Sequence, residues 1–582
     1  MKPALRVHQW PDASLFAALV AFRAINALLV RTYFSPDEYW QALEVAHRTV
    51  FGYGYLTWEW HVALRSILHP ALFAALYRVL SALGLDDGRL FIYAPRLLQS
   101  VFAAAADLYT YRFAYRLYEN QVIANWTLFL SVISWWNFFC STRTLANSME
   151  AALTIIALYY WPFTTATATA APSSSRHDSQ SEIQDQHPVA AQHAPGCLRT
   201  SLAIASLTCI FRPTAAILWI FLGTSLLLGY LKKGDMPSFI TTILNAAIIG
   251  GTAIVGSAVL DSTLFYSEWV WTPLHFIRVN IVEGISLFYG SSPWHWYLSQ
   301  GLPILFGIYL PFVLHGSWRA WQTPTSGLNA HLKHQVLSLS LWLLIIYSCL
   351  QHKEWRFLYP MLYPLLPYAA DSIYQAWLLS KTAAAATTTT STDSITMKQQ
   401  PKRRLSSKAT TMSMIVVLVV VVNAIMAWYT VWVHQRGVVD VMEWIRNQAR
   451  ETDQIRSIGV LMPCHSTPWY SSVHLRHRPP LEMWFVTCSP PLGDIDPVAY
   501  KDESDIFYED PVVFMSQRTK DQLQDRGSKD SHLIFFEDLL RSHSEMIPWL
   551  EMQGYQECSR FFNSHFHDDS RRRGDVLVYC TD

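Results

Sequence analysis

Charged residues are scarce in this chain, and neither sign is in excess. Only 15% of the 582 residues are Asp, Glu, Lys or Arg, whereas an average soluble protein carries about 25%. The 44 basic and 44 acidic residues cancel, which excludes the strongly basic surface typical of nucleic-acid binding. Hydrophobic residues make up 51% and aromatic residues 14%, as expected where rings lie at bilayer interfaces. The composition predicts a membrane protein with a sizeable soluble part.

No two cysteines form a CxxC pair, which weakens the case for a structural zinc site. Four of the eight cysteines lie in or beside apolar segments and are expected to be small packing residues: Cys140, Cys197, Cys209 and Cys349. The other four lie together in the polar C-terminal part: Cys464, Cys488, Cys558 and Cys580. Two disulfides in an oxidising compartment or one zinc site would account for this second group, and we favour the disulfides.

A small-residue cleavage site is missing after the first apolar run. That run, Ala13 to Val30, follows Lys2 and Arg6 and leads directly into the polar stretch 35–39. We therefore expect a retained first helix rather than a cleaved leader.

Eleven apolar runs predict eleven membrane-spanning helices. Seven have full membrane length, at about 13–33, 91–111, 122–140, 239–260, 335–351, 357–379 and 412–433. Four are shorter, at about 147–163, 198–211, 214–231 and 302–317. Arg212-Pro213 is expected to break the helix between two of them. We assign the apolar stretch 67–84 as an interfacial helix, because a span there would invert the orientation of everything that follows.

The distribution of Lys and Arg fixes an orientation by the positive-inside rule. With the N-terminus in the cytosol, the clustered basic residues fall on the cytosolic side, including Lys232, Lys233 and the run 398–408. The opposite, lumenal side then receives four loops and the C-terminal tail: 34–90, 141–146, 261–301, 352–356 and 434–582. Residues 1–433 are thus predicted to form the membrane-embedded part.

Two low-complexity stretches, 164–197 and 382–411, are too poor in apolar residues to fold and are predicted to be disordered cytosolic loops. The tail 434–582 mixes helical patterns, such as 438–450, with short strand-like runs, such as 458–462. It is predicted to be a soluble α/β domain in the lumen.

Two adjacent carboxylates, Asp37 and Glu38, follow the first predicted span in the stretch 35–41 (SPDEYWQ). Carboxylates near lipid are costly and usually functional, and a partly buried one can act as general base on a sugar hydroxyl. A structural alternative also fits, since Pro36 suits the first position of a helix and acids suit its first turn.

Transfer from a phosphate-linked sugar also needs cations near the leaving phosphate, and the predicted lumenal loops supply candidates. They are Arg143 and the stretch 352–356 with His352, Lys353, Glu354 and Arg356. A basic cap on a helix end would explain the second group equally simply. Aromatic residues around Trp294 and His295 could stack on a sugar ring or form an interfacial belt.

The first-loop stretches 35–41 and 51–60 (FGYGYLTWEW) resemble the signature of the dolichyl-phosphate-mannose-dependent mannosyltransferases of glycosyltransferase family 22. Four more stretches are similar to further motifs of that family: 140–151 (CSTRTLANSMEA), 211–215 (FRPTA), 291–303 (SSPWHWYLSQGLP) and 352–360 (HKEWRFLYP). The resemblance implies a helical membrane protein of the GT-C fold in the endoplasmic reticulum, with an active site formed by lumenal loops.

That resemblance also implies the chemistry. It implies an inverting transfer from the lipid donor dolichyl-phosphate-mannose that gives an α-linked mannose, with no metal and no other cofactor. Asp37 would be the base, with Glu38 beside it. This chain departs from the family pattern at Ser35, where many relatives have His, and at Trp355, where relatives often have a second acid.

The tail stretches 461–471 (LMPCHSTPWYS) and 502–508 (DESDIFY) resemble the branch of the family that acts on the glycosylphosphatidylinositol (GPI) anchor. This implies a GPI glycolipid as acceptor and addition of the third, α1,2-linked mannose. Two alternative functions make different predictions for the sequence. A mannosyltransferase of the N-glycan precursor should lack the motif 464–471. A lipid transporter should show internal repeats, and none is visible.

Overall fold

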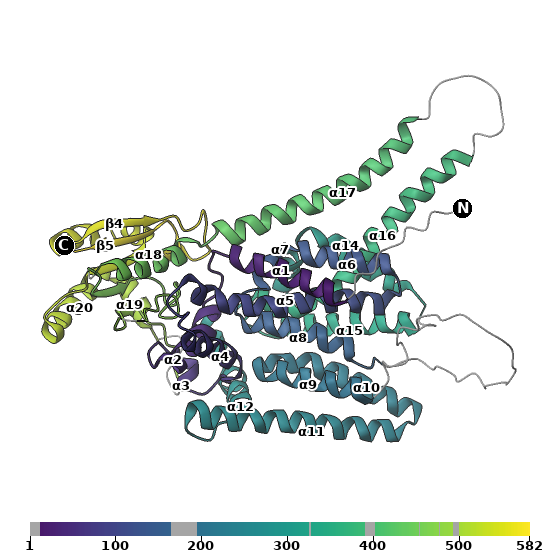
Figure 1. Ribbon diagram of the computed structural model, residues 1–582, viewed down its shortest axis with the longest axis horizontal. Coiled ribbons are helices and arrows are strands. Elements are labelled where there is room, and N and C mark those ends of the chain that lie inside the picture. Colours follow the sequence, from purple (N-terminus) through teal and green to yellow (C-terminus); the bar gives the residue numbers. More distant parts are fainter. Residues whose placement is uncertain are drawn as a thin grey trace.

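The computed structural model describes residues 12–163, 195–324, 328–389, 402–452, 454–476, 478–492 and 500–581. Most of this described part is helical, and thirteen of its helices form a bundle from which α17 and the end of α16 diverge (Figure 1). They are α1 (Asp12–Leu29), α5 (Arg89–Tyr118), α6 (Gln121–Ile133), α7 (Trp135–Cys140), α8 (Ala146–Tyr160), α9 (Pro195–Phe211), α10 (Ala216–Lys233), α11 (Met236–Asp261), α13 (Leu302–Phe306), α14 (Leu310–Gln322), α15 (Leu328–Cys349), α16 (Tyr359–Thr389) and α17 (Lys402–Trp428).

Each apolar run of the sequence coincides with a helix or a broken helix in this bundle. The run 122–140 divides into α6 and α7 at Ser134, and the run 302–317 divides at the turn Gly307–Tyr309. The break at Arg212-Pro213 is confirmed, because α9 ends at Phe211 and α10 begins at Ala216. Within the described residues, six helices are long and apolar enough to cross a membrane, so a total of eleven spans stays a prediction.

The shorter elements gather at one end of the bundle, between the long helices and the C-terminal domain (Figure 1). They are α2 (Glu44–Phe51), α3 (Trp58–His61), α4 (Leu68–Ala82) and α12 (Thr272–Ile277). Helix α4 occupies the stretch assigned as interfacial. Its buried residues Phe73 and Tyr77 belong to one hydrophobic cluster with Val438 and Met442 of the C-terminal domain, so it packs at this junction.

The predicted disorder of 382–411 is wrong at both ends of that stretch. Helix α16 continues to Thr389 and α17 begins at Lys402, so that 382–389 and 402–411 are helical. Alanine has the highest helix propensity, and the run 383–386 favours continuation of α16. Residues 390–401 lie outside the described part of the chain. The same holds for residues 164–194 of the other predicted loop.

The C-terminal part forms an α/β domain beyond the end of the bundle, as predicted (Figure 1). It comprises α18 (Gly437–Glu451), β1 (Ser457–Val460), β2 (Glu482–Phe485), α19 (Glu503–Glu509), α20 (Pro511–Arg526), β3 (His532–Phe536), α21 (Asp538–Ser542), α22 (Met546–Met552), β4 (Gln556–Phe561) and β5 (Val576–Cys580). The sheet order is β2-β1-β3-β5-β4.

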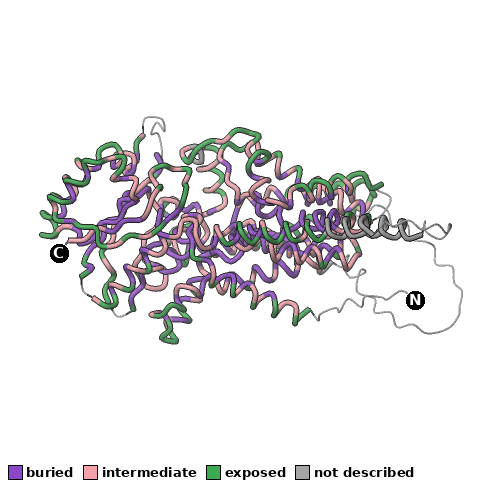
Figure 2. Tube along the Cα trace, turned by 90° about the horizontal axis from the view of Figure 1, so that it is seen from above, coloured by how far each residue is buried: buried purple, intermediate pink, exposed green. Residues whose placement is uncertain are grey.

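Strand β1 pairs in parallel with β2 and β3, and β5 runs antiparallel between β3 and β4. Strands β1 and β3 are buried along their whole length, as expected for central strands covered on both faces. Figure 2 shows that buried segments occur both inside the helical bundle and inside this domain.

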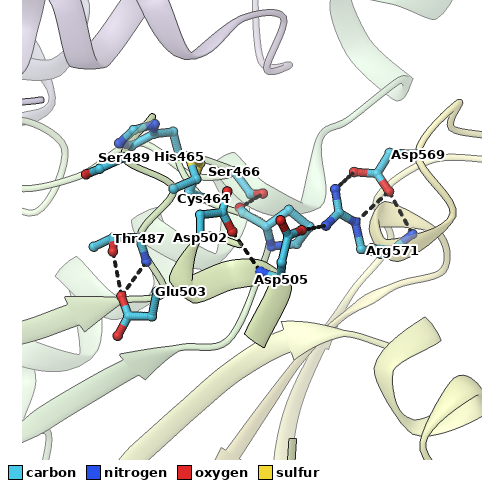
Figure 3. Close-up of a disulfide and its surroundings, with 12 residues drawn as sticks. Cys464, His465, Ser466, Thr487, Ser489, Asp502, Glu503, Asp505, Asp569 and Arg571 are labelled. Atoms are coloured by element: carbon cyan, nitrogen blue, oxygen red, sulfur yellow. Dashed lines mark hydrogen bonds and ion pairs between the residues drawn. A yellow bond between two sulfur atoms is a disulfide. The ribbon is translucent and has the colours of Figure 1, made fainter. Parts of the chain in front are cut away.

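Two disulfides join the four cysteines of the domain, as favoured from the sequence. Cys464 pairs with Cys488, and Cys558 on β4 pairs with Cys580 on β5. Figure 3 shows the first of these beside His465 and the acidic residues of α19. His465 lies close to the first pair and His532 to the second, but the thiols that a metal would need are consumed by the disulfides.

Candidate active site

Asp37 lies in a short 3-10 turn, Pro36–Glu38, between α1 and α2. Pro36 begins the turn after Ser35, whose backbone is extended, so the helix-start interpretation of the two acids is confirmed. The two carboxylates nevertheless differ sharply in surroundings. The Asp37 side chain is 18% exposed, whereas that of Glu38 is 0% exposed. Of the two side chains, only that of Asp37 is partly exposed.

Arg356 links Asp37 to a second carboxylate. Its Nη1 atom lies 2.5 Å from Oδ2 of Asp37 and donates to Oγ of Ser35 at 2.9 Å. Its Nε and Nη2 atoms donate to the two oxygens of Glu354 at 2.5 and 2.8 Å. Burial alone would lower the pKa of Arg356, but Asp37 and Glu354 raise it above its ordinary value. Ser35, which stands in place of the family histidine, thus helps to fix Arg356.

Arg65, which the sequence did not single out, is a second arginine near Asp37. Its Nη2 atom lies 2.8 Å from Oε1 of Glu59, and Oε2 of Glu59 accepts a 2.8 Å hydrogen bond from Gln41. Burial lowers the pKa of Arg65, but Glu59 and Asp37 outweigh it and raise the value, while Arg356 opposes them. The two arginines therefore share one electrostatic environment. The only feature of the sequence that could have indicated Arg65 is its position shortly after the first-loop motif 51–60.

Aromatic residues from loops that are distant in the sequence pack against one another beside Asp37 and Arg65. Trp58 stacks on Tyr289 with ring centroids 6.4 Å apart, and Tyr289 lies 6.5 Å from the ring of His352. His352 contacts the carbonyl oxygen of Gly290 through Nδ1 and Oε1 of Glu354 through Nε2, each at 3.3 Å. Burial lowers the pKa of His352, but Glu354 outweighs it and raises the value, which favours the charged ring that donates from both nitrogens.

Glu38 and Arg143 form a closed ion-pair network behind Asp37. Oε1 of Glu38 accepts from Arg96 at 2.8 and 3.0 Å, and Oε2 lies 2.8 Å from Nη1 of Arg143. Arg143 is 0% exposed and also donates to the carbonyl oxygen of Thr32 at 2.7 Å. Both carboxylate oxygens of Glu38 are thus engaged. The sequence had suggested Glu38 and Arg143 as candidates for catalysis and substrate binding. In the structure both side chains are fully buried, and their ion pair holds the loop in place.

Three other predicted residues face neighbouring loops or solvent. Lys353 donates to the carbonyl oxygen of Ser292 at 2.9 Å and to that of Leu350, so it ties two loops together. Trp294 is 69% exposed, and His295 is exposed beside Ser299. The contacts of Lys353 therefore fit the structural alternative, a basic residue that caps a helix end.

The membrane-region motifs meet behind Arg356. Nε of Arg212 lies 2.9 Å from Oε2 of Glu150, and its Nη1 donates to Oδ1 of Asn147 at 2.8 Å. Asn147 in turn donates to the carbonyl oxygen of Arg356 at 3.3 Å. Three motifs that are far apart in the sequence therefore support the residue that holds Asp37.

The C-terminal motif 464–471 packs directly on the first loop. The Trp40 ring lies 4.4 Å from the ring of His465 and 5.4 Å from that of Trp469. Its Nε1 atom donates to the carbonyl oxygen of Thr467 at 2.9 Å. Four residues after Trp40, the helical segment reaches Glu44, which accepts hydrogen bonds from the backbone N–H groups of Ser471 at 3.0 Å and Tyr55 at 3.1 Å. The domain therefore fixes the segment that carries Asp37.

Comparison with known proteins gives concordant results. Residues 14–474 match the Alg9-like mannosyltransferase family. The chain is 36% identical to "GPI mannosyltransferase 3" of Yarrowia lipolytica, over 97% of this chain and 96% of that one. It is 34% identical to the human "GPI alpha-1,2-mannosyltransferase 3", over 96% and 85%.

Among solved structures, the chain is similar to ArnT from Cupriavidus metallidurans bound to undecaprenyl phosphate. The TM-score is 0.51 at 13% identity, and 97% of each chain is covered. That likeness supports a shared GT-C-type fold. The chain belongs to the Alg9-like mannosyltransferase family, and within it to the group of the GPI mannosyltransferase 3 relatives.

Proposed function

We propose that this enzyme transfers the third, α1,2-linked mannose from dolichyl-phosphate-mannose to a GPI-anchor precursor. Its nearly full-length similarity to proteins named for this activity supports the proposal. So does the packing of Trp40 against the motif 464–471, because the stretch typical of the GPI branch lies beside the catalytic loop. We place the active site and the C-terminal domain in the lumen of the endoplasmic reticulum.

Asp37 is the proposed general base. Its carboxylate accepts the proton of the acceptor hydroxyl while that oxygen attacks the anomeric carbon of mannose. The bond between that carbon and the phosphate oxygen breaks, and dolichyl phosphate leaves with the bonding electrons. Inversion at the carbon gives an α-linked product from a β-linked donor. Arg356 orients Asp37 through the 2.5 Å contact.

Arg356 and Arg65 supply positive charge for the leaving phosphate. Each is held by a glutamate, Arg356 by Glu354 and Arg65 by Glu59, so both guanidinium groups are preorganised. Such fixed charges stabilise a developing anion because they need little reorganisation during the reaction. Trp58 and Tyr289 offer ring faces on which a sugar can stack. The proposal requires no metal ion.

The partly exposed carboxylate of Asp37, which interacts with both Arg356 and Arg65, is the single observation that carries the proposal. The test is lipid analysis of a strain that lacks the protein. We expect a GPI precursor with two core mannoses to accumulate, while N-glycan precursors remain complete. Accumulation of a truncated dolichol-linked oligosaccharide with normal GPI lipids would assign the enzyme to the N-glycan pathway instead.

A further inference from the structure

A small pocket lined by apolar and charged side chains lies beside the ion pair between Arg96 and Glu38. Its volume is about 70 Å³, and it is enclosed by the start of α5, by α18 and by the loop around Ser471. Tyr39, Tyr77 and Arg96 form its buried floor, and Arg31 and Arg89 are exposed at its rim. Nothing in the proposed transfer reaction uses this pocket.

Positive charge predominates in its lining, which contains four arginines and two acids. Arg96 is neutralised by Glu38, and Arg89 lies 3.5 Å from Glu443 at the rim. The other lining acid, Asp440, contacts Arg436, which is outside the pocket, at 2.7 Å. Asp440 also interacts with Arg31, and Glu443 with Arg446, but four arginines against two acids leave the lining with a net positive charge.

Arg446 is the most informative of these residues because it is only 3% exposed. Its Nη2 atom donates to the carbonyl oxygens of Asp87 at 2.9 Å and Gly88 at 3.0 Å. Its Nε atom is buried and has no hydrogen-bond partner among the described residues. Burial and the neighbouring Arg450 lower the pKa of Arg446, although Asp87 and Glu443 act in the opposite direction. A buried guanidinium with a free donor is costly unless an anion completes the site.

Size and position narrow the class of anion. One water needs about 10–15 Å³ of such cavity volume, so a pocket of about 70 Å³ has room for about five waters or one phosphate group. It opens where α1 ends and α5 begins, at the junction of the helical bundle with the C-terminal domain. Arginines clustered at a membrane boundary attract the phosphates of anionic lipids.

We propose that this pocket binds the phosphate of an anionic lipid headgroup, with Arg446 and Arg31 as its principal ligands. The ligand is a phosphodiester of the phosphatidylinositol type in the surrounding bilayer. Binding there stabilises the junction between α5 and α18. The inference does not depend on which acceptor the enzyme uses.

The test is direct binding to the full-length protein in neutral detergent. The probes are short-chain phosphatidylinositol, short-chain phosphatidylcholine and inorganic phosphate. We expect phosphatidylinositol to bind most tightly. Arg446→Gln should weaken it about tenfold, the value of one charged hydrogen bond. Arg31→Gln should weaken it about fivefold, the contribution of one basic residue near lipid phosphate.

Two further variants separate this site from general effects of charge. Glu443→Gln removes an acid from the rim and should strengthen binding of phosphatidylinositol, which no unfolding artefact would produce. Arg456→Gln removes an exposed arginine outside the pocket and should change nothing. Equal binding of phosphatidylinositol and phosphatidylcholine, unaffected by all variants, would overturn the proposal. Equally tight binding of inorganic phosphate would overturn the lipid as the source of the anion.

Discussion

Arg356 Nη1 lies 2.5 Å from Asp37 Oδ2, although 319 residues separate the two in the chain. The contact joins the loop after α1 to the turn before α16, and Glu354 holds the same guanidinium from the other side. Asp37 is thereby fixed in place while its side chain keeps some access to solvent. The whole account of catalysis depends on this pair.

Arg356 and Lys353 should differ in their effect on turnover. Arg356→Gln removes charge beside the leaving phosphate and also releases Asp37, so kcat should fall about 10²- to 10³-fold. Lys353→Ala removes hydrogen bonds to loop carbonyls and should lower thermal stability more than kcat. Steady-state kinetics with a defined donor would measure both. A larger loss of kcat in Lys353→Ala than in Arg356→Gln would reverse our assignment.

Arg65 should behave like Arg356, although it was not visible as a candidate in the sequence. Arg65→Gln is expected to lower kcat about 10²-fold, because one of two cations near the phosphate is lost. Arg65→Lys keeps the charge and should recover part of that activity. Unchanged kinetics in Arg65→Gln would leave Arg356 as the only cation that serves the phosphate.

The Cys464–Cys488 disulfide should matter for activity, and Cys558–Cys580 for stability alone. The paired cysteines are 24 and 22 residues apart, so the two disulfides close loops of similar length. Each should add about 3–4 kcal/mol to the free energy of unfolding. Only the first anchors the motif that packs on Trp40. Cys464→Ser should therefore lower both melting temperature and kcat, whereas Cys558→Ser, the matched control, should lower the melting temperature alone. Equal kinetic defects would show that the motif does not position the loop.

A buried histidine pair predicts acid sensitivity of the junction. Nε2 of His47 lies 2.9 Å from Nδ1 of His474, and burial lowers their pKa values to about 3 and about 4. Below pH 6.5 the two histidines bind protons more readily in the unfolded chain than in the folded one. The folded state therefore loses stability as pH falls from 6.5 toward 4. Burial raises the pKa of Glu44 to about 7. This glutamate therefore has the opposite effect, and adds stability to the folded state as pH falls from about 7 to 4.5.

Two histidines outweigh one glutamate below pH 6.5, so the wild-type melting temperature should fall between pH 7.5 and pH 5. His474→Asn removes one of the two titrating rings and should reduce that fall. Melting curves at the two pH values measure the difference. An equal fall in both proteins would mean that other groups control the acid response.

The sequence predicted the helices far better than the contacts between them. Long apolar runs and Pro213 determine where helices form and end, because these signals are local. The partners of Asp37 and Glu38 are not local: Arg65, Arg96 and Arg356 come from three other segments, and sequence spacing carries no information about such pairs. The adjacent acids therefore looked alike in the sequence, whereas their different burial separates their roles.

Membrane orientation can be tested with glycosylation tags. Tags placed after Val433 should be modified, as expected for the lumen, and tags within 390–401 should not be. The natural sequon at Asn125 lies inside α6 and should stay unmodified. A cytosolic C-terminal domain would mean that α4 crosses the membrane or that another span is miscounted.

The most direct measurement is transfer of mannose by the purified protein from dolichyl-phosphate-mannose to a GPI acceptor with two core mannoses. The wild type and Asp521→Asn, which changes an exposed carboxylate on α20, should form the three-mannose product at equal rates. Asp37→Asn keeps the shape of the side chain but loses the proton acceptor, and its rate should fall about 10²- to 10⁴-fold at unchanged melting temperature. A near-normal rate in Asp37→Asn would contradict the assignment of Asp37 as the base.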